Sequence, residues 1–142
     1  MASPLTMSKS DREAFLADVH VGVLAIARDG APLAGPVWYR YEPGGDVVIS
    51  IGPESEKARL LAATERASLC AQREELPYVF VTVEGPVTIS PGDDAERARL
   101  AERYLGELAA RYLEATKGEE TVIARLTPER WRTQDYSQIT LV

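Results

Sequence analysis

Residues 47–61 read VVISIGPESEKARLL, and a strand pattern gives way to a helix pattern inside this stretch. Valine and isoleucine dominate its first positions, as in a buried β-strand, and Gly52-Pro53 ends that run. Alanine and leucine then recur at helical spacing behind Ser55, a residue type that favours helix N-caps. We therefore expect a strand over residues 46–51 and a helix over residues 54–64.

The beginning of this helix carries a hydroxyl and two cations, namely Ser55, Lys57 and Arg59. A helix N-terminus has unsatisfied backbone N–H groups and the positive end of the helix dipole, so it favours an anion. A nearby lysine adds a point charge that suits a phosphate. The same residues also fit an ordinary helix start, in which Ser55 caps the backbone and Lys57 points into water. Both interpretations stay open on this stretch alone.

Turn residues divide the remaining chain into strands and helices. Asp29-Gly30 and residues 43–46 mark hairpin turns, and Gly85-Pro86 interrupts a long strand, which predicts a bulge or a barrel corner there. A capping box at residues 10–13 predicts Ser10 as the cap of the first helix. The expected elements are strands over residues 20–28, 32–42, 46–51, 67–73, 78–90 and 121–126, and helices over 11–18, 54–64 and 94–116.

The order of these elements predicts the fold class. Six strands, mostly in hairpin order with helices inserted irregularly, favour a mainly β (α+β) fold, a six-stranded antiparallel split β-barrel with flanking helices. No Gly-rich dinucleotide fingerprint follows any strand. Residues 1–142 are expected to form one domain, and the last helix to carry an apolar stripe. The apolar stripe of that helix is Ala101, Leu105, Leu108 and Tyr112.

Charge and residue counts exclude several classes of function. The formal net charge of -6 argues against general binding of nucleic acids or anionic membranes, which requires an excess of lysine and arginine. His20 is the single histidine and Cys70 the single cysteine, so the usual zinc ligand sets are missing and no metal is expected. We interpret Cys70 as an inert strand residue and His20 as an ordinary strand-edge residue, the alternatives being a catalytic thiol and a catalytic base.

The N-terminus and the hydropathy of the chain bear on its location. The segment MASPLTMSKSD has neither the basic cluster nor the apolar core of a secretory signal. No apolar run approaches the roughly 20 residues that a membrane span needs. We therefore expect a soluble, cytoplasmic protein.

The segment GPVWYRY concentrates aromatic residues on one expected strand. Alternation turns Trp38 and Arg40 to one face and Tyr39 and Tyr41 to the other, so one ring could lie beside a planar ligand while its neighbours fill the core. Pro36 has no N–H and breaks local pairing, which leaves nearby backbone groups free to meet a ligand. The alternative is that these are simply core and surface aromatics of a barrel.

Five short motifs occur in order along nearly the whole chain. They are Asp29-Gly30-Ala31-Pro32, Pro36-Val37-Trp38-Tyr39, Ser55-Glu56-Lys57-Ala58-Arg59, Pro77-Tyr78 and Val81-Thr82-Val83-Glu84-Gly85. On these motifs the chain resembles the flavin- and deazaflavin-binding split barrels related to pyridoxamine 5'-phosphate oxidase. The resemblance implies a homodimer with two cofactor sites at the subunit interface, each holding FMN or the deazaflavin F420. It implies that the cofactor phosphate lies against Ser50, Ser55 and Lys57, in agreement with the anion site derived above.

The resemblance also implies where the ring of the cofactor lies. Pro36, Val37, Trp38 and Tyr39 would run beside the ring system, with backbone groups at its polar edge. Trp131 resembles a C-terminal aromatic residue that approaches the site from the partner subunit. The candidate cofactor site therefore comprises eight residues: Pro36, Val37, Trp38, Tyr39, Ser50, Ser55, Lys57 and Trp131.

The function that the resemblance favours is that of an oxidoreductase, which transfers hydride between FMN or F420 and a small organic substrate. The chain has no evident basic set for a second, substrate phosphate, so we do not expect a true pyridoxamine-phosphate oxidase. No side chain need act as a nucleophile, and Tyr39, Tyr78 or Arg40 could orient or protonate a substrate. One alternative is a non-catalytic flavin or haem binding protein, for which His20 is the single histidine ligand. Another is a barrel kept for stability alone.

Overall fold

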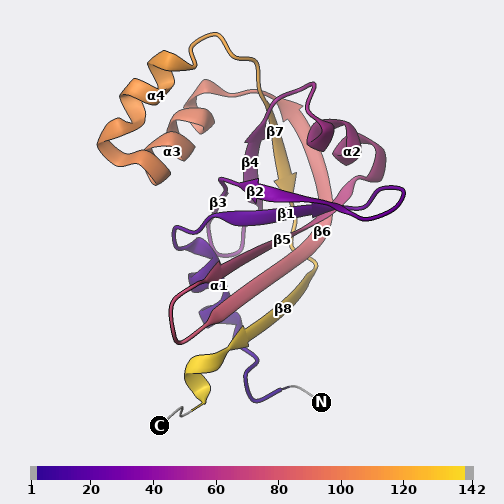
Figure 1. The fold of residues 1–142 in the computed structure, drawn as a ribbon, viewed down its shortest axis with the longest axis vertical. Helices are drawn as coiled ribbons and strands as arrows, with labels where there is room; N and C mark the ends of the chain where they lie inside the picture. The colour runs from indigo at the N-terminus through magenta and orange to yellow at the C-terminus, as the bar shows by residue number, and fades with distance from the viewer. Residues whose placement is uncertain (1–2, 140–142) are drawn as a thin grey trace.

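An antiparallel sheet that curls into an open half-barrel forms the body of the protein (Figure 1). In chain order its strands are β1 (Gly22–Ile26), β2 (Leu33–Val37), β3 (Arg40–Tyr41), β4 (Val47–Ile51), β5 (Arg66–Arg73), β6 (Val79–Pro91), β7 (Val122–Leu126) and β8 (Arg130–Asp135). The computed structural model describes residues 3–139. The strands pair in the order β2-β1-β5-β6-β7-β4-β3, and β8 also pairs with β6. Only Trp38 and Tyr39 separate β2 from β3, the two ends of this order, so the curled sheet returns toward its start.

The predicted mainly β antiparallel class is confirmed, whereas the predicted number of six strands is too low. The strand expected over residues 32–42 divides into β2 and β3, because the backbone of Tyr39 bonds to a side chain instead of a strand. Its N–H donates to Tyr104 Oη at 3.0 Å, and the Tyr104 hydroxyl lies 2.9 Å from its carbonyl oxygen. The sequence pattern also misses β8, because Trp131 is the single large apolar residue of RWRTQD. This strand pairs with β6 along Val79 to Glu84.

β6 changes its partners at Gly85-Pro86, where the interrupted strand pattern predicts a bulge or a corner. Its first half pairs with β5 and β8, and its second half pairs with β7. At the change, the Thr127 N–H donates to the Pro86 carbonyl oxygen at 2.9 Å. A Cβ atom on Gly85 would overlap the carbonyl oxygen of Thr127, so only glycine allows the two backbones to approach this closely. The pair forms the corner of the half-barrel.

Helices flank the sheet. They are α1 (Lys9–Ala17), α2 (Glu56–Thr64), α3 (Asp94–Leu105) and α4 (Ala109–Ala115), with the short 3-10 turns η1 (Gly106–Leu108) and η2 (Tyr136–Gln138). The cap of α1 is Ser8, whose Oγ accepts from the Asp11 N–H at 3.1 Å, and the prediction of Ser10 is wrong. Within residues 3–139, no helix has both the length and the apolar character needed to cross a bilayer.

The helix expected over residues 94–116 is broken at Gly106. This glycine has a φ of 55°, in the left-handed region that ends helices and that side chains disfavour. The chain then passes through η1 into α4, and α3 and α4 form a hairpin at the upper left of Figure 1. Ala101 is buried, but Leu108 is 58% exposed and Tyr112 is 36% exposed. The predicted apolar stripe therefore does not continue beyond the break.

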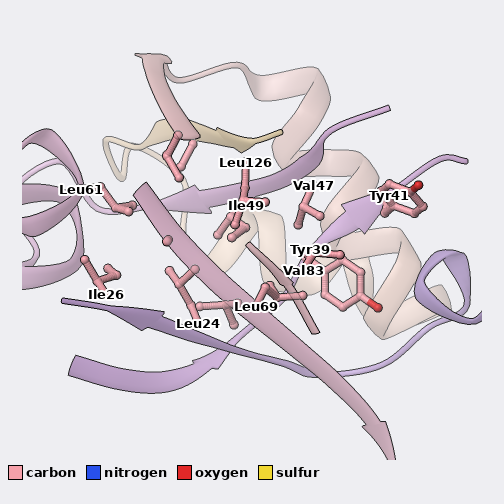
Figure 2. Packing of buried hydrophobic residues seen from close by; sticks show 14 of the residues in the cluster. Leu24, Ile26, Tyr39, Tyr41, Val47, Ile49, Leu61, Leu69, Val83 and Leu126 are labelled. Atoms are coloured by element: carbon pink, nitrogen blue, oxygen red, sulfur yellow. The ribbon is translucent and has the colours of Figure 1, made fainter. Parts of the chain in front are cut away.

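The core lies on the concave side of the sheet, where buried side chains from β1, β4, β5, β6 and β7 meet (Figure 2). Leu16 of α1 and Leu61 of α2 join this cluster and are almost fully buried. Burying such a side chain contributes about 1.5–3 kcal/mol, so these two residues hold their helices against the sheet. This packing holds the start of α2 in a defined position beside the end of β4.

Candidate functional site

The junction of β4 and α2 is a tight turn closed by Ser55. The Ser55 hydroxyl donates to the Gly52 carbonyl oxygen at 2.7 Å and accepts from the Ala58 N–H at 3.1 Å. The Ser55 N–H also donates to Gly52, at 3.2 Å. The hydroxyl is thus used within the chain, as the helix-cap interpretation predicts. Ser55 shapes the turn, and any anion there must find other donors.

Lys57 and the first turn of α2 supply those donors. The N–H groups of Glu56 and Lys57 begin the helix and have no carbonyl four residues back within it. Within residues 3–139, Lys57 forms no ion pair. A Cβ atom added to Gly35 would lie 3.8 Å from Lys57 Cε, so the lysine stem runs along β2. Arg28 pairs with the carboxylate of Glu56, the first residue of α2, and so offsets its negative charge.

A hollow of about 340 Å³ joins this helix start to β2. Six of the eight candidate residues line it, so the structure brings most of the predicted site together. They are Pro36, Val37, Trp38, Ser50, Ser55 and Lys57. Ligand pockets have volumes of about 300–1000 Å³, and this hollow is at the lower end of that range.

Trp38 forms an aromatic wall of the hollow, and two tyrosines of the α3–α4 hairpin hold it in place. Its ring stacks on Tyr104, with centroids 5.0 Å apart and planes 6° apart, and contacts Tyr112 at 5.4 Å. The hydroxyl of Tyr104 is 2.7 Å from the His20 carbonyl oxygen and accepts from the Tyr39 N–H. Trp38 therefore presents a fixed surface to the hollow.

Arg40 lies on the same face as Trp38, and it anchors α3. Its Nε donates to Glu96 Oε2 at 2.8 Å and its Nη2 donates to Glu96 Oε1 at 2.5 Å. The Glu96 side chain is buried, and its hydrogen bonds to Arg40 lower the pKa of this carboxyl group. Such a bidentate pair is strong and directional. Arg40 thus places α3 through Glu96. The predicted contact of Arg40 with a substrate would need the same guanidinium, which is already bonded.

Tyr39, Trp131 and Tyr78 lie away from the hollow. The Tyr39 ring is fully buried, and its hydroxyl donates to the Leu16 carbonyl oxygen at 2.7 Å. The alternation predicted for this segment is confirmed, because Tyr39 and Tyr41 enter the core while Trp38 and Arg40 face the helices.

Trp131 packs edge-on against Tyr41 at 6.1 Å and lies under the Arg12 guanidinium at 4.5 Å, within its own chain. Tyr78 is half-exposed, just before β6.

His20 and Cys70 line a different hollow, of about 630 Å³, on the convex face of the sheet. The imidazole stacks on Phe15 at 4.3 Å, and its Nε2 is 3.1 Å from the Phe15 carbonyl oxygen. Burial lowers the pKa of His20, so its neutral form is favoured. A haem iron would have to use Nδ1, because Nε2 is already bonded. Within the part of the chain that the structure describes, no three His, Cys, Asp or Glu side chains gather as a metal site.

Sequence reasoning missed the residues that the α3–α4 hairpin and the following loop bring to the site. A second hollow of about 170 Å³ shares Trp38, Ser50 and Tyr112 with the first one. It is also lined by Arg97 and by residues 119–121. These residues are far from β4 in the sequence and form no local motif. No signal in the sequence indicates them, because the pattern places Tyr112 in the apolar stripe of one unbroken helix.

Comparisons with known proteins agree with this architecture. The sequence profile described as Pyridoxamine 5'-phosphate oxidase matches residues 9–135. The chain therefore belongs to the pyridoxamine 5'-phosphate oxidase family, as its motifs predict. No curated protein matches the chain.

Several solved structures share the fold. The conserved hypothetical protein Rv2991 from Mycobacterium tuberculosis has a TM-score of 0.78 and 23% identity, over 97% of this chain and 91% of that protein. A structure described as F420 Reductase has a TM-score of 0.68 and 22% identity, over 84% of this chain and 94% of the other. The FAD and Heme binding protein from Mycobacterium smegmatis has a TM-score of 0.68 and 21% identity, over 92% of this chain and 72% of that protein. At these identities the likeness concerns the fold alone.

Proposed function

We propose that the protein is an oxidoreductase that binds FMN or F420 in the hollow between β2 and α2. The observation that carries this proposal is the meeting of Lys57 and the α2 N-terminus with Pro36, Val37 and Trp38 around one hollow. The lining thus combines a cation and a helix N-terminus with strand residues and an aromatic ring. A ligand that carries both a phosphate and a planar ring matches this lining.

The donor set fits a phosphate group. Lys57 Nζ supplies a charge, the Glu56 and Lys57 N–H groups point out of the helix start, and Ser50 adds a hydroxyl on the lining. Ser55 holds the turn through Gly52 and so keeps these N–H groups in place. The pairing of Glu56 with Arg28 reduces the repulsion that an anion would meet.

The remaining residues orient a ring and shield it from water. Pro36 and Val37 of β2 line the hollow, and Trp38 provides a rigid side wall. When bound, the flavin or deazaflavin would supply the hydride transfer, so the protein itself need not provide a nucleophile. Tyr112 of α4 also lines the hollow, where its ring would limit the substrate to a small organic molecule.

Titration of the protein with FMN and with F420, followed by fluorescence, tests the proposal through Lys57→Ala. The loss of one charge-assisted contact costs about 1.5–3 kcal/mol, which corresponds to a roughly 10- to 150-fold weaker affinity. Arg59→Ala is the matched control, because it removes the same charge from the same helix and its exposed side chain does not line the hollow. We expect Arg59→Ala to bind nearly as tightly as the wild type. Equal affinities for Lys57→Ala and the wild type, or no binding of either cofactor, would contradict the proposal.

A further inference from the structure

The side chain of Tyr104 takes the place of a strand partner at the break between β2 and β3. Its hydroxyl accepts from the Tyr39 N–H at 3.0 Å and lies 2.7 Å from the His20 carbonyl oxygen and 2.9 Å from the Tyr39 carbonyl oxygen. In an unbroken strand, the N–H and carbonyl groups of Tyr39 would pair with a neighbouring strand. One phenol oxygen from α3 therefore holds the backbone of the residue that directly follows Trp38.

The ring of Tyr104 also holds Trp38 itself. The two rings stack with their centroids 5.0 Å apart and their planes 6° apart. Trp38 lines both the hollow at Lys57 and the second hollow, whereas Tyr104 lines neither of them. Tyr104 thus supports the aromatic wall from behind and offers no surface to a ligand in either hollow.

The helix that carries Tyr104 is anchored on both sides of this contact. Nη2 of Arg103 donates to two carbonyl oxygens at the end of α1, at 2.9 Å and 2.7 Å. Toward the start of α3, Glu96 accepts two hydrogen bonds from Arg40. One anchored helix therefore holds both residues that follow Trp38, the first through its backbone and the second through its side chain.

We propose that Tyr104 is a positioning residue of the cofactor site, which fixes the Trp38 ring and through it sets the affinity for a flavin or deazaflavin ring. This inference rests on the proposed function and adds to it a residue outside the lining of both hollows. Without the Tyr104 hydroxyl, the Tyr39 backbone loses its partner and the chain between β2 and β3 is free to shift. A planar ligand would then have to order Trp38 on binding, which costs affinity.

Titration of the wild type and of Tyr104→Phe with FMN and with F420 tests this inference. The variant keeps the stacked ring and loses only the hydroxyl. We expect about threefold to tenfold weaker affinity, which corresponds to the loss of one hydrogen bond. Tyr136→Phe is the matched control, because its hydroxyl donates to Gln134 Oε1 at 2.6 Å and lies outside both hollows. It should bind the cofactor as tightly as the wild type.

A double-mutant cycle with Trp38→Leu separates positioning from a general structural role. If Tyr104 acts through Trp38, Tyr104→Phe should change the affinity by less than about twofold once the indole is absent. Trp38→Leu alone should weaken binding at least as much as Tyr104→Phe does. All titrations contain sucrose, which favours the compact state, and far-UV circular dichroism checks the fold, so that a partly unfolded variant is not mistaken for a weak binder.

Intrinsic fluorescence follows Trp38 in the absence of a ligand. The chain has two tryptophans, Trp38 and Trp131, so Trp131→Phe leaves Trp38 as the single emitter. Compared with Trp131→Phe alone, the further change Tyr104→Phe should shift the emission to longer wavelength and increase its quenching by acrylamide, because the indole is held less firmly against α3.

Four results would each overturn the inference and leave the proposed function standing. They are equal affinities of Tyr104→Phe and the wild type, a loss that persists in the Trp38→Leu background, Trp38→Leu protein that binds as tightly as the wild type, and an unchanged Trp38 emission. Wild-type protein that binds neither FMN nor F420 would contradict the proposed function, and this inference with it.

Discussion

At the scale of single residues, the buried hydroxyl of Tyr39 shows how the site strand is fixed from behind. The ring fills the core and its hydroxyl donates to the Leu16 carbonyl oxygen of α1. Its backbone N–H donates to the Tyr104 hydroxyl, so both the side chain and the backbone of Tyr39 are held in place. Trp38, the preceding residue, faces the opposite side and is placed in the hollow as a consequence.

Tyr39→Phe should lower the free energy of unfolding by about 1–3 kcal/mol at pH 8, because the Leu16 carbonyl loses its donor. Burial raises the pKa of Tyr39 above its ordinary value of 10.0, so folding favours the neutral phenol. Its contribution is complete below pH 10 and is lost as the pH rises, because the unfolded chain then releases the proton more easily. The difference between wild type and variant should therefore shrink by up to about 1.4 kcal/mol per pH unit above pH 10.

Urea unfolding at pH 8, 10 and 11 measures this difference. Tyr78→Phe is the control, since its half-exposed hydroxyl should contribute little at pH 8. A difference between wild type and Tyr39→Phe that stays constant across the three pH values would show that the hydroxyl is not buried as described.

Residue types alone could predict Lys57 and the turn at Ser55, because both belong to a local pattern at one helix start. They could not decide how the Ser55 hydroxyl is used, since a cap and a phosphate donor require the same residue. The structure shows it bonded to Gly52 and Ala58. Glu119 and Glu120 could not be assigned to the site either, because nothing near them in the sequence indicates a ligand.

At the scale of elements, boundaries follow punctuating residues where these are present. Gly52-Pro53 places the end of β4 correctly, α2 begins at Glu56, two residues after the predicted start, and Gly85-Pro86 marks the corner of β6. The break between α3 and α4 escapes prediction, because leucines continue at helical spacing across Gly106. The sequence pattern misses β8 because this strand has no apolar alternation and is held by its pairing with β6.

Gly85→Ala should destabilise the protein by about 1–3 kcal/mol or more, because its methyl group would overlap the Thr127 carbonyl oxygen where β6 turns the corner. Gly52→Ala is the matched control, since a Cβ atom there would lie 4.0 Å from the Ser55 Cβ. We expect thermal unfolding to show a clearly lower midpoint for Gly85→Ala and a small change for Gly52→Ala. Similar midpoints for the two variants would mean that the corner does not depend on glycine.

At the scale of the whole molecule, the convex face of β1 is the feature that the fold leaves uncovered. Val21 is 54% exposed and Val23 is 41% exposed, and both line the hollow of about 630 Å³ with Cys70. Pro36 lines this hollow and the proposed cofactor site. We propose that a second copy of the chain covers this face, so that the homodimer interface reaches the edge of the site.

Val23→Asp should convert a dimer into a monomer, because it places a charge in the centre of the proposed interface. Light scattering should give twice the chain mass of 15.6 kDa for the wild type and the single mass for the variant. Leu108→Asp is the control, as Leu108 is 58% exposed on η1 and does not line the convex hollow. A wild-type protein that remains monomeric at a protein concentration of roughly tens of micromolar would contradict the proposed dimer.

A crystal structure of the complex with FMN would show whether the start of α2 binds the phosphate of a flavin-type cofactor. We predict a phosphate within hydrogen-bond distance of Lys57 Nζ and of the Glu56 and Lys57 N–H groups, with the ring against Pro36 to Trp38. An FMN phosphate bound elsewhere, with Lys57 left in solvent, would show that the start of α2 is not the phosphate site.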